Sequence, residues 1–478
     1  MTLTRRLTLP RAAGLKPLAL ALSLGFAAGA AQAQSLKDLY EAARVYDATY
    51  LSARNLADSA QFRADQAHGL RLPTVGLQAS STLQRVEADA TSKSIDTPIT
   101  SPPTYTTSST NTEANTTATQ VALSAQQTVF NRSNDATISQ ADRAVDIAQA
   151  QLRLAEQDLI VRVAQAYFDV LSATDTLGTV QAGKTAISEQ LASAKRNFEV
   201  GTATITDTRE AQARYDLSLA QELAADNDLR VKRVALEQLV GRQGVAPRPL
   251  ALPVALPPVV PANVDDWVTG ADARSPVVQQ AQLGLDIAKL ETEKARAGHL
   301  PVVTVGATYA RNYPSGASDT SSGGLLLQST RNGNSSSASL GVTLTMPLFA
   351  GFTVQNRVKE TLSLEEKARN DLDAARRGVA QGTRQAFFGV QSGRAQVKAL
   401  EAAESSSKLA LEATQLGYKV GVRVNLDVLN AQTQLFTTQR DLAKARYDVI
   451  VGDLKLRQAA GQLQPTDVEA ANALLAAP

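Results

Sequence analysis

The stretches FEVGTATITDTREAQ, residues 198–212, and YKVGVRVNLDVLNAQ, residues 418–432, are two versions of one phrase. They align at a constant offset of 220 residues, which pairs Gly201 with Gly421 and sets an aspartate six residues after each glycine. Each copy lies between long stretches without proline. The pattern therefore predicts the tight turn of a helical hairpin, in which glycine adopts a positive φ and the acid opens the next helix. The constant offset predicts an internal duplication.

The composition argues against an enzyme. Hydrophobic residues make up 44% of the 478 residues but aromatic residues only 4%, which suits long alanine-rich helices better than a compact catalytic core. The lack of cysteine excludes disulfides, thiolate metal sites and a lipid anchor on an N-terminal cysteine, and two histidines leave little for histidine-based catalysis. We predict no catalytic residues, no metal and no cofactor.

The first 33 residues have the pattern of a secretory signal peptide. Four basic side chains precede an apolar run over residues 18–30, and a small-residue cleavage site follows at 31–33. Removing this segment leaves slightly more acidic than basic residues, which argues against nucleic-acid binding. The remaining chain has no apolar run long enough for a transmembrane helix.

Four short stretches change from helical periodicity to strict alternation of apolar and polar residues, as in strands with one wet face. Each is about ten residues long, the length that a tilted strand needs to cross a bilayer. A soluble two-sided sheet is the alternative, but the wet faces lack the charges expected of one. The predicted strands are 74–84, 120–130, 303–310 and 340–348, with Ser/Thr/Pro-rich or Ser/Gly/Asn-rich loops over 87–117 and 312–338.

Long helices are predicted after each strand pair. Residues 131–200 repeat apolar residues every seven positions, which favours a left-handed supercoil, and would reach about 105 Å at 1.5 Å per residue. The helices predicted over 35–71 and 205–241 together nearly match that length, so they could stack end to end beside it. Shorter helices over 275–299 and 424–461 give a looser match in length in the second half.

Four membrane strands cannot close a barrel, and an open edge in lipid would leave backbone groups unpaired. Closure must come from other copies of the chain. Two copies would give eight strands, whose interior side chains largely fill, whereas three give twelve and a continuous lumen. We therefore favour a homotrimer.

These features together resemble the TolC family of outer-membrane exit ducts: the signal peptide, two strand pairs separated by long helices, the duplication and the paired turn phrases. The similarity spans essentially the whole mature chain, and the missing lipid-anchor cysteine places it nearer to the unlipidated members than to the lipidated drug-efflux ducts. The resemblance implies a membrane α+β fold: a trimeric 12-stranded outer-membrane β-barrel, four strands per chain, continued by a long periplasmic α-helical barrel.

The resemblance also implies a gate at the periplasmic end, closed by hydrogen bonds and ion pairs between helix pairs. An arginine against a carboxylate would be a strong latch, repeated three times in a trimer. The alternative for Asp207 is that it merely caps a helix, together with Glu210. Matched by motif, the gate residues are Gln190, Thr206, Asp207, Tyr418 and Arg423.

Asp427 matches one of the acids that ring the lumen constriction in the family. Three carboxylates around one axis would attract cations and make the pore blockable by multivalent cations. The chain departs from the pattern at Asn430, where a second acid is expected, and Asp427 could instead serve only the helix dipole. The turn tips would meet an adaptor protein, or else serve turn geometry alone; they are Val200, Gly201, Thr202, Val420, Gly421 and Val422.

The predicted function is a passive exit duct for small toxic compounds or for type I protein secretion. Its predicted partners are outer-membrane lipid, a periplasmic adaptor and an inner-membrane ABC or RND-type transporter. The alternative is a trimeric surface adhesin, which would have no use for a duplicated gate phrase. The predicted divisions are a signal peptide (1–33), a first repeat (34–246), a Pro-rich equatorial linker (247–271), a second repeat (272–461) and a C-terminal tail (462–478).

Overall fold

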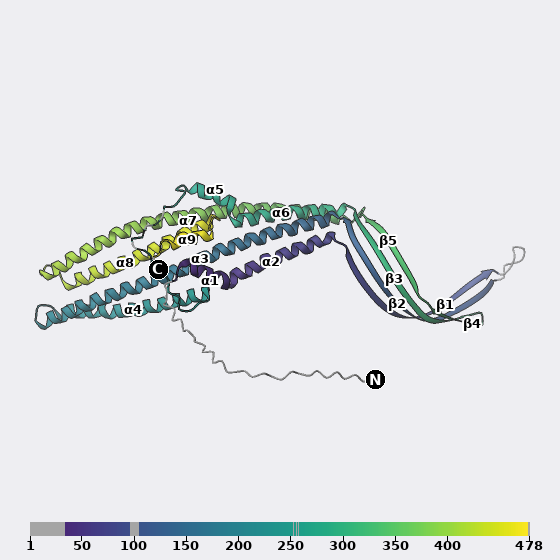
Figure 1. Ribbon diagram of the computed structural model, residues 1–478, viewed down its shortest axis with the longest axis horizontal. Coiled ribbons are helices and arrows are strands. Elements are labelled where there is room, and N and C mark those ends of the chain that lie inside the picture. The colour runs from purple at the N-terminus through teal and green to yellow at the C-terminus, as the bar shows by residue number, and fades with distance from the viewer. Residues whose placement is uncertain (1–33, 96–104, 252, 255, 257, 477–478) are drawn as a thin grey trace, which may run out of the picture.

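The molecule is a long rod of helices that continues at one end into a curved sheet (Figure 1). The computed structural model describes residues 34–476, apart from 96–104, 252, 255 and 257. The predicted signal peptide, residues 1–33, lies outside the described residues.

The first half of the rod contains four α-helices. They are α1 (Leu36–Tyr46), α2 (Ala48–His68), α3 (Arg132–Glu199) and α4 (Ile205–Val240), and a short 3-10 helix, η1 (Gly69–Arg71), follows α2. The single helix predicted over 35–71 is therefore wrong. It breaks at Asp47, whose backbone is extended (φ −62°, ψ 115°) and whose side chain accepts the Tyr50 N–H at 2.8 Å, as a residue that starts a new helix does.

The second half repeats this order with additional short elements. Its helices are α5 (Val264–Arg274), α6 (Pro276–Arg296), η2 (Ala297–His299), α7 (Thr353–Lys419), α8 (Asn425–Ala459) and α9 (Pro465–Asn472). Helix α5 begins inside the stretch predicted to be a linker, and α9 lies in the predicted tail. Both lie beside the middle of the rod (Figure 1).

End-to-end stacking of short helices beside long ones is confirmed. Helices α4 and α2 both pack along α3, towards its opposite ends, and α8 and α6 do the same along α7 (Figure 1). The long helices α3 and α7 have 68 and 67 residues, so each reaches about 100 Å at 1.5 Å per residue.

The main hydrophobic core lies near mid-rod, where α1, α3, α4, α8 and α9 contribute side chains to one buried cluster. Tyr167 and Phe168 are among its largest members and are at most 1% exposed. The Tyr167 hydroxyl donates to the backbone oxygens of Gln34 and Arg248 at 3.1 and 3.0 Å, and accepts the Arg248 N–H at 2.8 Å. This hydroxyl ties the chain entering α1 to the chain leaving α4.

We expect Asp47→Ala to lower the melting temperature of the purified protein. The change removes the cap of α2 and the bidentate partner of Arg162, whose Nη1 and Nη2 lie 2.9 and 3.0 Å from the two carboxylate oxygens. A cap is worth about 1 kcal/mol, and Arg162 is a third exposed and keeps Asp158 as a partner, so we expect a loss of about 2 kcal/mol. Thermal scans by circular dichroism measure it.

Asp47→Asn is the matched control, because it keeps an acceptor for the Tyr50 N–H and should lose less. The hydrogen bond from Arg162 holds the pKa of Asp47 below its ordinary 3.8. Its stabilisation is therefore complete at neutral pH and disappears only as the pH falls through that lowered pKa. An unchanged melting temperature in Asp47→Ala would show that this contact adds nothing.

The sheet is four strands wide, in the order β1, β2, β3 and then β4 and β5, which follow one another along the same edge of β3. Every neighbouring pair is antiparallel, and the ladder between β2 and β3 has one irregularity, between Thr128 and Phe130. The strands are β1 (Thr74–Ile95), β2 (Tyr105–Phe130), β3 (Val302–Ser322), β4 (Leu325–Asn332) and β5 (Ser335–Thr345).

The strands are much longer than predicted, and the loops predicted over 87–117 and 312–338 are largely wrong. β1 and β2 have 22 and 26 residues, and their ladder continues without a shift to Ile95 opposite Tyr105. Serine and threonine give this segment a loop-like composition. Threonine is nevertheless β-branched and suits an extended backbone. These residues are extended because they pair with a neighbouring strand, which their composition alone does not indicate.

Candidate functional site

The two turn phrases form equivalent hairpins at the end of the rod farthest from the sheet (Figure 1). Gly201 and Gly421 have φ values of 79° and 81°, the left-handed conformation that ends a helix. The following N–H groups bond back to the helix: Thr202 N–H donates to Asn197 O at 2.8 Å, and Val422 N–H to Gly417 O at 2.9 Å. All six predicted tip residues are exposed.

Asp207 lies in the first turn of α4 and is the third residue of that helix, not its N-cap. Thr204, and not Asp207, is the N-cap: its Oγ1 accepts the Asp207 N–H at 3.2 Å. One carboxylate oxygen of Asp207 accepts from the Thr204 N–H at 3.0 Å and from its hydroxyl at 2.8 Å. The predicted pairing with Glu210 does not form the cap. Thr206 is exposed.

Asp427 occupies the equivalent position in α8. Its carboxylate lies 3.4 Å from the Val424 N–H and 3.6 Å from Nη1 of Arg423. Within one protomer, Arg423 therefore pairs with Asp427 and not with Asp207. The Arg423 side chain remains 61% exposed, so most of its guanidinium is available to another partner.

Two hydrogen bonds join the first hairpin to the second through predicted gate residues. Gln190 of α3 donates its side-chain amide to Asn425 Oδ1 at the start of α8. Asn197 of α3 donates to the Tyr418 hydroxyl of α7 at 3.1 Å. The structure thus brings Gln190 and Tyr418 into contacts between helix pairs, with partners that sequence reasoning missed.

A third contact involves Asn430, the residue that departs from the family pattern. Nη2 of Arg214, on α4, donates to Asn430 Oδ1 at 3.0 Å. A position expected to carry a lumen acid thus carries a neutral amide that is bonded to a cation. Arg214 lies two positions after the phrase that ends at Gln212, so the repeat alone gave no signal for it.

An apolar cluster holds these polar contacts in register. Buried side chains of α3 and α4 pack around Leu429 of α8, which is fully buried, with Tyr215 against them; the α3 and α4 members are Ile187, Leu191, Ala194 and Ala211. Asn425 is 2% exposed, and its Nδ2 has no partner among the described residues. The contact of Gln190 with Asn425 is therefore shielded from water, which strengthens it.

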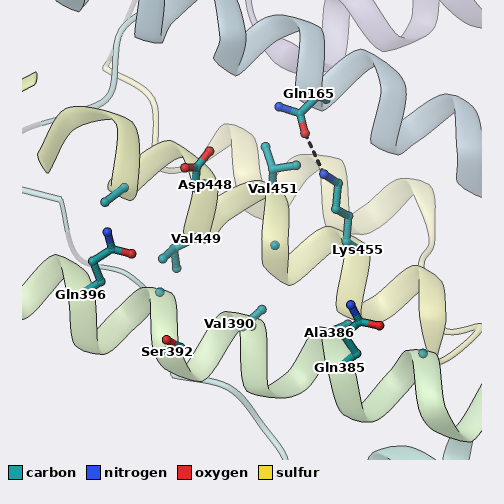
Figure 2. Close-up of a pocket in the computed structure, with 15 residues that line it drawn as sticks. Gln165, Gln385, Ala386, Val390, Ser392, Gln396, Asp448, Val449, Val451 and Lys455 are labelled. Atoms are coloured by element: carbon teal, nitrogen blue, oxygen red, sulfur yellow. Dashed lines mark hydrogen bonds between the residues drawn. The ribbon is translucent and has the colours of Figure 1, made fainter. Parts of the chain in front are cut away.

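A cavity of about 590 Å³ lies away from the turns, in the groove between α7 and α8 near mid-rod (Figure 2). Lys455 closes one side by donating to Gln165 of α3 at 2.8 Å. Gly382 and Gly389 leave open space at its wall, whereas Gly393 and Gly452 let α7 and α8 pack closely through Val449 and Val390. Its lining offers no arrangement of groups for catalysis.

Two further features are absent from the part of the chain that the structure describes. No helix there combines the length and hydropathy needed to cross a bilayer. No group of three or more histidine or acidic side chains there is arranged to hold a metal ion.

Comparison with known proteins agrees with this geometry. The family model described as "Outer membrane efflux protein" matches residues 24–242 and 267–462. The chain is 30% identical to outer membrane protein TolC of Vibrio cholerae over 459 residues, covering 96% of this chain and 98% of that protein. It is 32% identical to the alkaline protease secretion protein AprF of Pseudomonas aeruginosa, covering 68% and 65%.

The fold has a solved counterpart in the outer membrane protein VceC of Vibrio cholerae. The two share 21% identity and a TM-score of 0.67, over 89% of this chain and 96% of that one. The family match covers most of the chain, including both turn phrases and the contacts between them. The chain therefore belongs to the outer membrane efflux protein family.

Proposed function

We propose that three copies of this chain form one continuous exit duct through the outer membrane and the periplasm. The observation that carries the proposal is the sheet, which is four strands wide with β1 at one edge and β4 and β5 at the other. Backbone groups at an open edge cannot be satisfied in lipid, so the edge of one protomer must pair with the next. Three copies give a closed barrel of twelve strands.

The helices continue this duct inward. With three copies around the same axis, three sets of helices about 100 Å long would enclose a tube below the barrel. The groove between α7 and α8 fits this arrangement, because Gly382 and Gly389 leave room for a helix of the neighbouring protomer to approach closely. The repeated order of helix, strand pair, long helix and return helix supports an internal duplication.

The domain organisation follows from that order. It consists of a signal peptide (1–33), a first repeat (34–246), an equatorial linker (247–271), a second repeat (272–461) and a tail (462–478). The linker and the tail lie against the middle of the rod, where Ala251 N–H donates to Leu474 O at 3.0 Å.

The periplasmic end of the duct is a gate. Within each protomer, Gln190, Tyr418 and Asn430 hold the second hairpin against the first, and between protomers the exposed Arg423 reaches Thr206 and Asp207 of the neighbour. Asp427 rings the narrowest point. Opening moves the α7/α8 hairpin away from the α3/α4 hairpin and breaks these contacts.

The exposed turn tips are the docking site for a periplasmic adaptor. Val200, Val420 and Val422 are 65–75% exposed at the very end of the rod. Exposing a group of apolar side chains to water is unfavourable, and such a patch is typical of a surface that binds a partner. The adaptor connects the duct to an inner-membrane ABC or RND-type transporter, which supplies the energy. The cargo is small toxic compounds, secreted polypeptides or both; the name of AprF refers to secretion of a protease.

A deletion strain tests this function. Loss of the chain should raise susceptibility to toxic compounds, abolish export of a protein substrate, or do both, and expression of the intact chain should restore the lost trait. In parallel, the purified protein should behave as a trimer by light scattering and conduct ions across a planar bilayer. A monomer that conducts nothing would contradict the proposal.

A further inference from the structure

The strand ladders divide the sheet into two faces with different chemistry. Residues that lie directly opposite each other in a ladder share a face of the sheet. From Thr128 towards the end of the sheet away from the helices, every ladder keeps one continuous register. One row, for example, is Leu77, Leu123, Tyr309 and Ala338. Odd-numbered positions of β1, β2 and β3 therefore form one face with the even-numbered positions of β4 and β5, and the remaining positions form the other.

The first face must be the one that meets lipid. Its apolar rows run from Val303 and Leu344 near the helices to Ala79 and Val121, a height that suits the apolar band of a barrel. Tyr313 follows two residues beyond, where an interfacial aromatic residue is expected.

Nearly every charged side chain of the described strands lies on this same face. Most lie beyond the apolar band, towards the end of the sheet away from the helices, and Arg85 there pairs with Glu87 at 2.6 Å. They are Arg85, Glu87, Asp89, Lys93, Glu113, Arg311 and Asp319.

The second face would line the lumen, and it is almost free of charge. It consists mainly of serine, threonine, glutamine, alanine and glycine. Among the described strands its one charged residue is Arg331 of β4, which lies opposite Gly316 of β3. Glycine has no side chain to cover the guanidinium, and Arg331 forms no ion pair among the described residues.

The height of Arg331 places it in the outer mouth. Its partner Gly316 lies three residues beyond Tyr313, so Arg331 is past the apolar band on the side away from the periplasm. In a trimer, three guanidinium groups would face one axis inside a wall that otherwise carries no charge. No carboxylate of the described strands lies on that wall to offset them.

We propose that Arg331 forms an anion-binding ring in the extracellular mouth of the duct. This inference rests on the trimeric duct proposed above. The lumen is then electrically polar along its length: Asp427 attracts cations at the periplasmic end, and Arg331 attracts multivalent anions at the outer end. The two rings act independently, because their separation far exceeds the Debye length of about 10 Å at 0.1 M salt.

Single channels in planar bilayers test the ring with inorganic tripolyphosphate as the probe. The compartment from which hexaamminecobalt(III) blocks identifies the periplasmic end. Tripolyphosphate added to the opposite compartment should reduce the current, and Arg331→Gln should raise the half-blocking concentration at least roughly tenfold, the low end of focusing in a charged cleft. Arg331→Lys should keep most of the block.

Arg311→Gln is the matched control, because it removes the same charge from the lipid-facing side of the same sheet. It should leave the block unchanged. The inference is overturned if tripolyphosphate blocks the wild type and Arg331→Gln equally, or if Arg311→Gln loses the block to the same extent. The proposed duct is still supported in either case if the channels conduct and hexaamminecobalt(III) blocks them. Failure of the wild type to form channels overturns the duct itself.

Discussion

Replacing Arg423 with alanine is expected to raise the single-channel conductance several-fold. Among the described residues of the protomer the guanidinium pairs with Asp427, at 3.6 Å, and the Arg423 side chain is 61% exposed. In the proposed trimer it would reach Asp207 of the next protomer, so one substitution removes three contacts. At about 0.5 kcal/mol for each exposed pair, the open state would gain about 1.5 kcal/mol, a roughly tenfold shift in population.

Asp207 needs a finer test, because its carboxylate also caps α4 through Thr204. Asp207→Asn keeps an oxygen that can accept the Thr204 N–H and removes only the charge. If Asp207 is a latch, this variant should conduct like Arg423→Ala. If it is only a cap, Asp207→Asn should conduct like the wild type, and Asp207→Ala should merely destabilise the helix end.

The ends of the long helices at the turn phrases were predictable from the sequence because local chemistry sets them. The long helix predicted over 131–200 is α3, Arg132–Glu199, since Gly201 ends it whatever the rest of the chain does. The full length of the strands was not predictable in this way. Residues 87–95 have a loop-like composition, and only their pairing with 105–113 makes them extended.

In the candidate site, too, the features set by local sequence were predictable and the long-range contacts were not. The glycines, the capping acids and the exposed tips follow from short-range patterns within each phrase, and the spacing of Thr204 from Asp207 could have identified the correct cap. The contacts from Asn197 to Tyr418 and from Arg214 to Asn430 join residues more than 200 positions apart. They depend on how two hairpins pack, which no local pattern in either hairpin encodes.

Asp427→Ala is expected to abolish most of the block by hexaamminecobalt(III) from the periplasmic side. Three carboxylates around one axis concentrate cations, and losing them should raise the half-blocking concentration at least roughly tenfold. Asp142→Ala, an exposed acid on α3 remote from the turns, is the control and should have no effect. Full block in Asp427→Ala would place the constriction elsewhere.

Asn430→Asp gives the sharper result, because Arg214 lies 3.0 Å from the amide oxygen that it replaces. The guanidinium would pair with the new carboxylate and cancel most of its charge, so the single variant should change cobalt block by no more than about twofold. Adding Arg214→Gln to it should strengthen the block roughly tenfold further, since three uncompensated acids then join those of Asp427. Arg214→Gln alone controls for the lost contact between α4 and α8. Equal strengthening in the single and double variants would mean that Arg214 does not neutralise a carboxylate at this position.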